Sequence, residues 1–309
     1  MSLALAVDVG GTKVETAFVA PDGTVVEGTR MRRPTGAGSS TEELWSSVAE
    51  CIRATLATRG DRELLGVGIG SAGPIDVQEG RVSPLNLVAW RGFPLRDRVQ
   101  ELVPGVPVTL RMDGLAIALA EHWVGAAQGY DDVMGVIVST GIGGGLVLHG
   151  STVAGPTGNA GHIGHIEVGG FDDPCACGGT GCVEAIASGP KTVAWARRQG
   201  FTGLTGEDLA AAHAAGDEIA IAAVARSGLA IGRAIASATA LVDLQIVAIG
   251  GGFSHVSPAL FDHIRAAIDE RVQFGFVTKV KVVPSGLSGA GPLIGAGALV
   301  HRAELVPAV

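Results

Sequence analysis

The sequence is poor in aromatic and in charged residues, which make up 4% and 17% of its 309 positions. No stretch of about 20 residues is both apolar and free of charges or helix breakers, so we expect no membrane segment and no membrane partner. Acidic residues outnumber basic ones by 30 to 22, which gives a formal net charge of −8. This balance argues against nucleic acid as a partner, because proteins hold nucleic acids largely by neutralising phosphates.

Cysteine is also scarce, since the chain has four and three of them fall within residues 175–182. Such a cluster does not suit a disulfide framework and suits a metal site better. The first residues show no basic leader, and we therefore expect a cytoplasmic protein. Apolar residues reach 47%, which excludes a disordered chain. At roughly 150 residues per domain, the length predicts about two domains.

Glycine, in contrast, is abundant: 48 residues are about twice the ordinary share of ~7%, which points to turns and close backbone approaches. We predict an α/β fold with a small N-terminal domain of residues 1–114 plus 291–309 and a larger domain of residues 115–290, the boundary falling near residues 110–116. Strands are expected at 3–9, 14–19, 24–28, 65–70, 106–110, 133–139, 145–148 and 246–249, and helices at 41–58, from Asp113 onward, and at 183–199, 207–214, 217–241, 257–273 and 293–302.

A first glycine-rich turn follows the first expected strand. Gly10 and Gly11 allow backbone N–H groups to approach an anion, and Thr12 and Lys13 add further donors. Asp8 can hold a water of a hydrated Mg²⁺. An ordinary Gly-Gly hairpin is the alternative. The turn is not a P-loop, because no glycine-lysine-serine/threonine run opens a helix.

Two further glycine-rich turns lie later in the chain. Thr140, Gly141, Gly143 and Gly144 follow the strand expected at 133–139, and Gly251 and Gly252 follow the strand at 246–249. A turn of this kind in each half suits the binding of one polyphosphate, and a turn without side chains suits a ribose or a flat ring. Together the three turns predict an ATP site.

The strongest metal signal combines one histidine with the clustered cysteines: His165, Cys175, Cys177 and Cys182. Three thiolates and one imidazole complete a tetrahedral Zn²⁺ site and leave no open position, so the ion should be structural. Reduced cysteines in a loop are the alternative.

These motifs, with the run from Gly161 to His165 and Glu184 after the last cysteine, resemble the signatures of the ROK family of repressors, open reading frames and kinases. The resemblance covers nearly the whole chain. It implies a two-domain actin-like ATPase fold of the sugar kinase type, with a zinc-stabilised loop and with ATP and Mg²⁺ bound between the domains. Because the phosphate motif begins at residue 8, with no DNA-binding extension before it, the kinase branch is favoured, as a homodimer or homotetramer.

The resemblance also implies site residues. Asp113 corresponds to the family's catalytic base, and Glu184 and His165 to residues that line the sugar, while Gly73 and Asn86 resemble positions near the sugar mouth. Two positions depart from the pattern: Met112 replaces an asparagine that contacts the sugar, and His162 replaces a glutamate. Histidine both donates and accepts hydrogen bonds, which suits a group such as an acetamido carbonyl.

The predicted function is ATP-dependent phosphorylation of the 6-hydroxyl of a hexose or N-acetylhexosamine, similar to that of glucokinases or N-acetylmannosamine kinases. A sugar-binding regulator without catalysis is the main alternative, which Met112 and His162 favour. A general Hsp70-like ATPase would not need the cysteine-histidine loop. The sequence leaves the sugar undecided, as well as whether polyphosphate replaces ATP as the donor.

Overall fold

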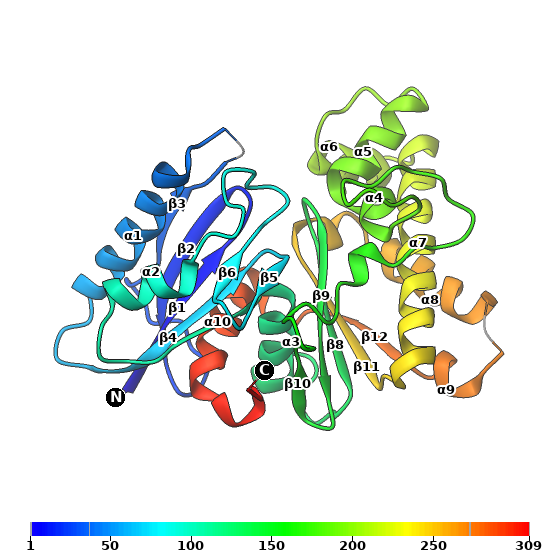
Figure 1. Ribbon diagram of the computed structural model, residues 1–309. Helices are drawn as coiled ribbons and strands as arrows, with labels where there is room; N and C mark the ends of the chain where they lie inside the picture. The colour runs from blue at the N-terminus through cyan, green and yellow to red at the C-terminus, as the bar shows by residue number, and fades with distance from the viewer. Residues whose placement is uncertain (1, 37, 272, 309) are drawn as a thin grey trace. The chain divides into compact units, whose positions relative to one another are not determined.

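The computed structural model describes residues 2–36, 38–271 and 273–308, and the chain forms two compact units (Figure 1). Residues 115–131 and 145–161 belong to the first unit, although we had expected them in the larger domain. Helix α3 (Asp113–Val124) lies in the first unit because it packs against α10 (Gly291–His301). The first unit comprises Met1–Asp131, Gly145–Gly161 and Gly286–Val309, and the second comprises Asp132–Gly144 and His162–Ser285.

The first unit contains a five-stranded sheet of order β3-β2-β1-β4-β7. Strand β1 is antiparallel to β2 and parallel to β4, which is in turn parallel to β7. The carboxyl ends of β1, β4 and β7 therefore meet at one edge, where Asp8 lies beside Gly70 and Gly70 beside Arg111. The strands are β1 (Ser2–Val9), β2 (Lys13–Val19), β3 (Met31–Pro34), β4 (Glu63–Ser71) and β7 (Val108–Met112).

The strand expected at residues 24–28 was wrong, because the third strand is β3. Only Val25 in the expected segment forms a bridge, to Val19. Gly23 and Gly28 have φ angles of +84° and +73°, which turn the chain at both ends of the segment and leave no room for an extended ladder.

Helices cover both faces of this sheet. Helix α1 (Thr41–Ala57) packs on β2 and β3, with the hydroxyls of Thr16 and Thr55 2.6 Å apart, while α3 and α10 pack on β1 and β4. Ser40, rather than Thr41, caps α1, since its hydroxyl accepts the Glu43 N–H and the Glu43 carboxylate accepts the Ser40 N–H. The remaining elements are β5 (Ile75–Asp76), β6 (Arg81–Val82), α2 (Leu95–Leu102), η3 (Ser288–Ala290) and η4 (Ala303–Leu305).

A second sheet has the order β10-β9-β8-β11-β12, in which β11 is parallel to both β8 and β12. Its strands are β8 (Val133–Val138), β9 (Ile142–Leu148), β10 (Ser151–Val153), β11 (Ile246–Gly250) and β12 (Lys281–Pro284). The helices of the second unit are η1 (Ile163–His165), α4 (Val183–Ala187), α5 (Gly189–Arg198), α6 (Gly206–Ala214), α7 (Glu218–Val242), η2 (Gly252–His255), α8 (Ala259–Arg271) and α9 (Gly275–Thr278).

The single helix expected at 183–199 is two helices, α4 and α5. Ser188 between them has extended backbone angles, and Pro190 stands in the first turn of α5. Proline lacks the N–H that a continuous helix would need at this position, whereas the first turn of a new helix does not need it. The break separates the segment that carries Glu184 from α5.

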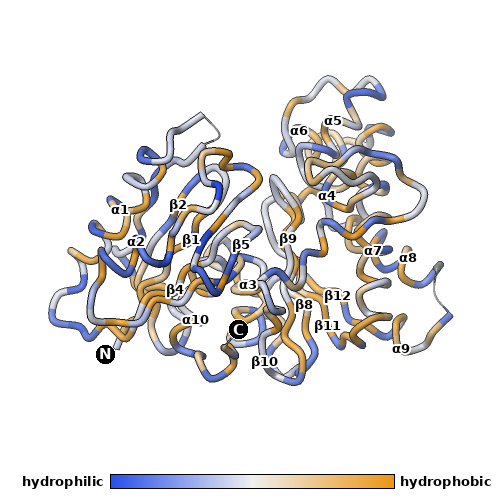
Figure 2. The backbone as a smooth tube through the Cα atoms, in the orientation of Figure 1, coloured by the Kyte–Doolittle hydropathy of each residue, from blue (hydrophilic) through white to orange (hydrophobic). Residues whose placement is uncertain are grey.

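Helix α7 is long and apolar enough to cross a membrane by length and composition, but 61% of its most apolar window is buried within the protein. It packs against α8, and Figure 2 shows that it is largely hydrophobic, like β8 and β11. This is the behaviour of a core helix, with the hydrophobic effect holding α7 inside the second unit.

Candidate active site

The turn between β1 and β2 is closed by hydrogen bonds within the first unit. The N–H of Gly10 donates to Lys13 O over 2.9 Å, and the hydroxyl of Thr35 donates to Gly10 O over 2.9 Å. A Cβ atom on Gly11 would lie 2.9 Å from Cβ of Asn86, so only glycine lets the Asn86 side chain rest against the turn. The structure thus brings together the glycine-rich turn after β1 and Asn86, which the sequence placed near the sugar mouth.

Lys13 is tied to Glu15, which follows two residues later on the same face of β2. Arg30 donates to the other carboxylate oxygen of Glu15 over 2.9 Å. Burial acts to raise the pKa of Glu15, but the hydrogen bond from Lys13 and the charges of both bases outweigh it and hold that pKa below its usual value. Sequence reasoning missed Glu15 and Arg30, although the Lys-x-Glu alternation in β2 was the available signal.

Asp8 lies near the carboxyl end of β1, and Asp113 directly follows the carboxyl end of β7. Both strands are parallel to β4, which lies between them. Asp8 is 7% exposed, and burial first, then the charge of Asp113, raises its pKa to about 7. Asp113 is the first residue of α3, and its carboxylate accepts the N–H of Gly114 over 2.7 Å. Two carboxylates at one buried edge favour a bound cation, because a cation relieves both desolvation and repulsion.

Met112 precedes Asp113 but does not line a polar site. Its side chain is 2% exposed and belongs to the hydrophobic core of the first unit, with Leu110 and Leu115. The thioether fills core volume and offers no strong hydrogen-bonding group, and the loss of a sugar contact at this position stays a prediction. An asparagine at this position would bury an amide among apolar side chains and lower stability.

The loop after β4 contains Gly73, which the sequence placed near the sugar mouth. The loop ends at Ile75, the first residue of β5, whose backbone is held by the Asn159 side chain. Asn159 Oδ1 accepts the Ile75 N–H over 2.9 Å, and Asn159 Nδ2 donates to Ile75 O over 2.7 Å. Sequence reasoning missed Asn159, since an isolated amide in a glycine-rich loop carries no pattern. It fixes the loop within the first unit.

The second unit contains a cavity of about 390 Å³. Ser139 and Thr140, from the turn after β8, form one part of its wall, and Gly252, after β11, forms another. Neighbouring positions of these turns, Gly141, Gly143, Gly144 and Gly251, do not line it. The other lining residues are largely apolar or small: Gly189, Pro190, Val193, Leu204, Thr205, Gly206, Glu207, Ala210, Phe253, His255 and Val256. Apolar walls with a few polar groups at one end are typical of a site for a small-molecule ligand.

His165, Cys175, Cys177 and Cys182 bring their ligand atoms within 4.8 Å of one another. The Sγ atoms of Cys177 and Cys182 are 3.7 Å apart, as are His165 Nδ1 and Cys175 Sγ. A tetrahedral Zn–S bond of 2.3 Å requires a sulfur separation of about 3.8 Å, so the four residues fit zinc. Burial raises the pKa of Cys182 to about 12 and also raises that of Cys175; a bound cation would be needed to keep these thiolates charged.

The loop that contains the cysteines is anchored to the helices beside it. The Asp173 carboxylate pairs with Arg226 of α7 and, over 3.6 Å, with Arg198. The Arg226 guanidinium also lies over the rings of Phe171 and Trp195, at 5.1 and 5.4 Å from their centroids. The loop therefore rests on a charged and aromatic support as well as on its cysteines.

Glu184 joins the cysteine-histidine loop to the glycine-rich turn after β8. It follows Cys182 by two residues, at the start of α4, and its Oε2 atom accepts the N–H of Ile142 over 2.9 Å. A Cβ atom on Gly141 would lie 2.6 Å from that oxygen, so the contact requires glycine. One carboxylate therefore fixes the turn that contains Thr140 and Gly141.

His162 lies beside His165, with the centroids of the two rings 5.7 Å apart. Burial, and next the neighbouring His165, lowers the pKa of His162 below its usual value. The ring is therefore neutral at pH 7, with one nitrogen that donates and one that accepts a hydrogen bond. A glutamate at this position would offer only acceptors once ionised.

A comparison with known protein families matches residues 4–303 to the ROK family. The chain belongs to this family. It is 32% identical to a glucokinase from Thermotoga maritima, over 96% of this chain and 97% of that relative. It is 36% identical to an N-acetylmannosamine kinase from Escherichia coli, over 80% of this chain and 82% of that relative.

A solved ROK family glucokinase from Streptomyces griseus, in complex with glucose and AMPPNP, shares the fold of this chain with a TM-score of 0.82. The two are 29% identical, over 97% of this chain and 99% of that one. These matches confirm the family and the actin-like α/β fold that the sequence motifs implied.

The zinc assignment predicts about one Zn²⁺ per chain in purified protein, measured by elemental mass spectrometry. Cys177→Ser should lose most of the metal and lower the melting temperature, because a closed four-ligand site contributes folding energy. Cys51→Ala, which alters a cysteine outside the cluster, should keep the full metal content. Wild-type protein with well under one zinc per chain would contradict the assignment.

The raised pKa of Asp8 predicts a dependence of stability on pH. The folded-state pKa of about 7 exceeds the ordinary value of 3.8, so the wild-type protein should lose stability as pH rises from about 4 to 7. Asp8→Asn lacks this titration, so its free energy of unfolding should rise by on the order of 2 kcal/mol relative to that of wild type over this pH range. Urea unfolding without nucleotide or divalent cations measures it, with the exposed Asp61→Asn as control; parallel pH profiles for all three proteins would contradict the expectation.

Proposed function

We propose that this chain is an ATP- and Mg²⁺-dependent kinase that transfers the γ-phosphoryl group to the 6-hydroxyl of a hexose or N-acetylhexosamine. The observation that carries the proposal is the hydrogen bond that the Ile142 N–H donates to Glu184, which ties the turn beside the cavity of about 390 Å³ to the cysteine-histidine loop. The solved relative in complex with glucose and AMPPNP supports both ligand classes.

The nucleotide would use the glycine-rich turns. The cavity beside Thr140 and Gly252 offers apolar walls for the adenosine, and Gly251 would lie next to it. N–H groups of the turn at Gly141, Gly143 and Gly144, and of Gly10 to Lys13, would bind phosphate oxygens. Asp8 suits a water of the hydrated Mg²⁺, because a buried carboxylate with a raised pKa gains from a cation; when bound, the ion neutralises charge on the transferred phosphoryl group.

Asp113 would be the catalytic base. The sugar hydroxyl gives its proton to the Asp113 carboxylate as its oxygen bonds to the γ-phosphorus, and the bond from that phosphorus to the ADP oxygen breaks. The position at the start of α3 suits this role, since the helix dipole and the Gly114 N–H stabilise the ionised form. The base needs to accept the proton only late in a loose transfer.

The sugar would be bound by His162 and Glu184, with His165 positioned by zinc beside them and with Gly73 and Asn86 on the first unit. The Glu184 carboxylate accepts hydrogen bonds from hydroxyl groups, while the neutral His162 ring can donate a hydrogen bond to a carbonyl oxygen. This donor favours an N-acetylhexosamine or another modified hexose over plain glucose. We further propose a cytoplasmic homodimer or homotetramer, as the sequence suggests.

A second candidate function is a sugar-binding regulator without catalysis. Two observations favour it: Met112, which packs in the core and offers no amide to a sugar, and His162. An assay that couples ADP release to a panel of hexoses separates the two functions, because a regulator binds sugar without releasing ADP.

The base assignment predicts that Asp113→Asn lowers kcat by on the order of 10²–10⁴. The amide oxygen can still accept the Gly114 N–H, so the melting temperature and nucleotide affinity should stay near those of wild type. Steady-state kinetics with nucleotide titration measures these quantities. Asp61→Asn, an exposed change of the same chemistry, is the matched control, and a variant at Asp113 with wild-type turnover would remove this residue from the mechanism.

The sugar assignment predicts that kcat/KM for N-acetylmannosamine equals or exceeds that for glucose in the wild-type enzyme. His162→Glu should shift the ratio toward glucose by about tenfold or more, since it replaces a donor with an acceptor. His162→Gln, which keeps a donor and an acceptor, should keep the wild-type ranking. A strong wild-type preference for glucose that His162→Glu leaves unaltered would refute this role of the histidine.

A further inference from the structure

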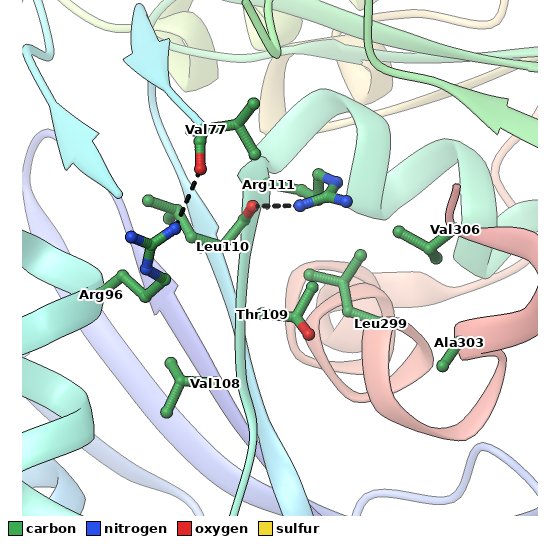
Figure 3. A pocket seen from close by; sticks show the side chains of 9 residues that line it. All are labelled: Val77, Arg96, Val108, Thr109, Leu110, Arg111, Leu299, Ala303 and Val306. Atoms are coloured by element: carbon green, nitrogen blue, oxygen red, sulfur yellow. Dashed lines mark hydrogen bonds between the residues drawn. The ribbon is translucent and has the colours of Figure 1, made fainter. Parts of the chain in front are cut away.

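A separate cavity of about 170 Å³ lies at the outer edge of β7 in the first unit (Figure 3). Strand β7 ends the sheet order, so this edge has no neighbouring strand. Arg96 of α2 and Arg111 of β7 line the cavity, together with Val77, Val108, Thr109, Leu110, Leu299, Ala303 and Val306. None of these residues belongs to the proposed active site.

Arg111 is a buried cation that pairs with no carboxylate among the described residues, 2–36, 38–271 and 273–308. Its residue surface is 8% exposed, and within the part of the chain that the structure describes its Nε atom has no hydrogen-bond partner. The other two nitrogens donate to backbone oxygens, Nη1 to Leu110 O over 2.9 Å and Nη2 to Pro307 O over 3.0 Å. Burial alone lowers the pKa of the guanidinium. A buried charge left without a counter-ion is costly, so its retention points to a ligand.

Arg96 supplies a second cation on the other side of the β7 edge, as Figure 3 shows. Its Nη1 atom donates to Val77 O over 3.0 Å and to Gln78 O over 3.2 Å, which holds the guanidinium in place. Its contact with Asp97 is a long one, 3.4 Å, to a carboxylate whose side chain is 62% exposed. The residues that line the cavity include no acid. Fixed guanidinium groups suit the oxygens of a carboxylate or a phosphate.

We infer that this cavity binds a small oxyanion, either a phosphate group or a carboxylate, between Arg96 and Arg111. At about 30 Å³ per water-sized group, the volume of about 170 Å³ holds five or six such groups, which suits an oxyanion and excludes a nucleotide. The inference does not rest on the kinase activity. Met112 is the last residue of β7, and Asp113 follows it. Arg111, which would bind the anion, is therefore two residues before the proposed base in the sequence.

The experiment titrates the full-length protein with inorganic phosphate, and separately with acetate, by calorimetry at constant ionic strength. Saturating AMPPNP and glucose are present so that the proposed nucleotide site is filled. We expect saturable binding that weakens by about tenfold or more in Arg111→Gln and in Arg96→Gln. Phosphate binding alone would identify a phosphoryl site, and acetate binding with the same dependence on the variants would identify a carboxylate site.

Arg53→Gln is the matched control, since Arg53 is an exposed arginine of α1 and does not line the cavity; it should bind as wild type does. Arg96→Gln keeps the test decisive if Arg111→Gln fails to fold, because the Arg96 side chain is 32% exposed. Binding of neither anion, or binding that both cavity variants leave unchanged, would overturn the inference.

Discussion

The hydrogen bond from the Ile142 N–H to Glu184 joins the parts of the second unit on which the proposed chemistry depends. Glu184 follows Cys182, so the cysteine-histidine cluster fixes where α4 starts and where the carboxylate points. The carboxylate in turn fixes the turn beside the cavity, and Gly141 must lack a side chain for this contact to form. A metal at the cluster would thus order a ligand-binding turn that contains none of its ligands.

The first unit relies on a different constraint, the shared carboxyl ends of three parallel strands. These ends bring Asp8 and Asp113 to one edge, where burial and mutual repulsion raise the pKa of Asp8 to about 7. Two close carboxylates raise the free energy of the folded state when no cation is bound, and a bound cation lowers it. Lys13 cannot supply this compensation alone, because it is already paired with Glu15. The electrostatics therefore favour Mg²⁺ as part of the binding chemistry, rather than lysine alone.

Features with a strong local signal could be predicted from the sequence, and features set by tertiary packing could not. The actin-like fold and the family followed from motifs, and α7 from a long apolar period. The strand expected at 24–28 failed because two glycines with positive φ override its β propensity, and the helix at 183–199 failed at Pro190.

Side-chain environments were the least accessible from the sequence. Met112 departs from the family pattern in the sequence, and only the packing showed that its side chain fills the core. Arg111 attracted no notice, because a lone arginine in a strand has no pattern. Its burial, with no carboxylate partner in the described part of the chain, is a property of the fold. Residues distant in the sequence determine the environment of both side chains, as they do for the hydrogen bond between Asn159 and Ile75.

The central claim is that the cysteine-histidine cluster orders the glycine-rich turn after β8 through Glu184. Hydrogen exchange at the Ile142 amide, followed before and after removal of zinc by a chelator, tests it most directly. The account predicts faster exchange at Ile142 together with residues 165–184, and unchanged exchange at residues 10–13 of the first unit. An Ile142 amide that stays protected while residues 165–184 lose protection would contradict the account.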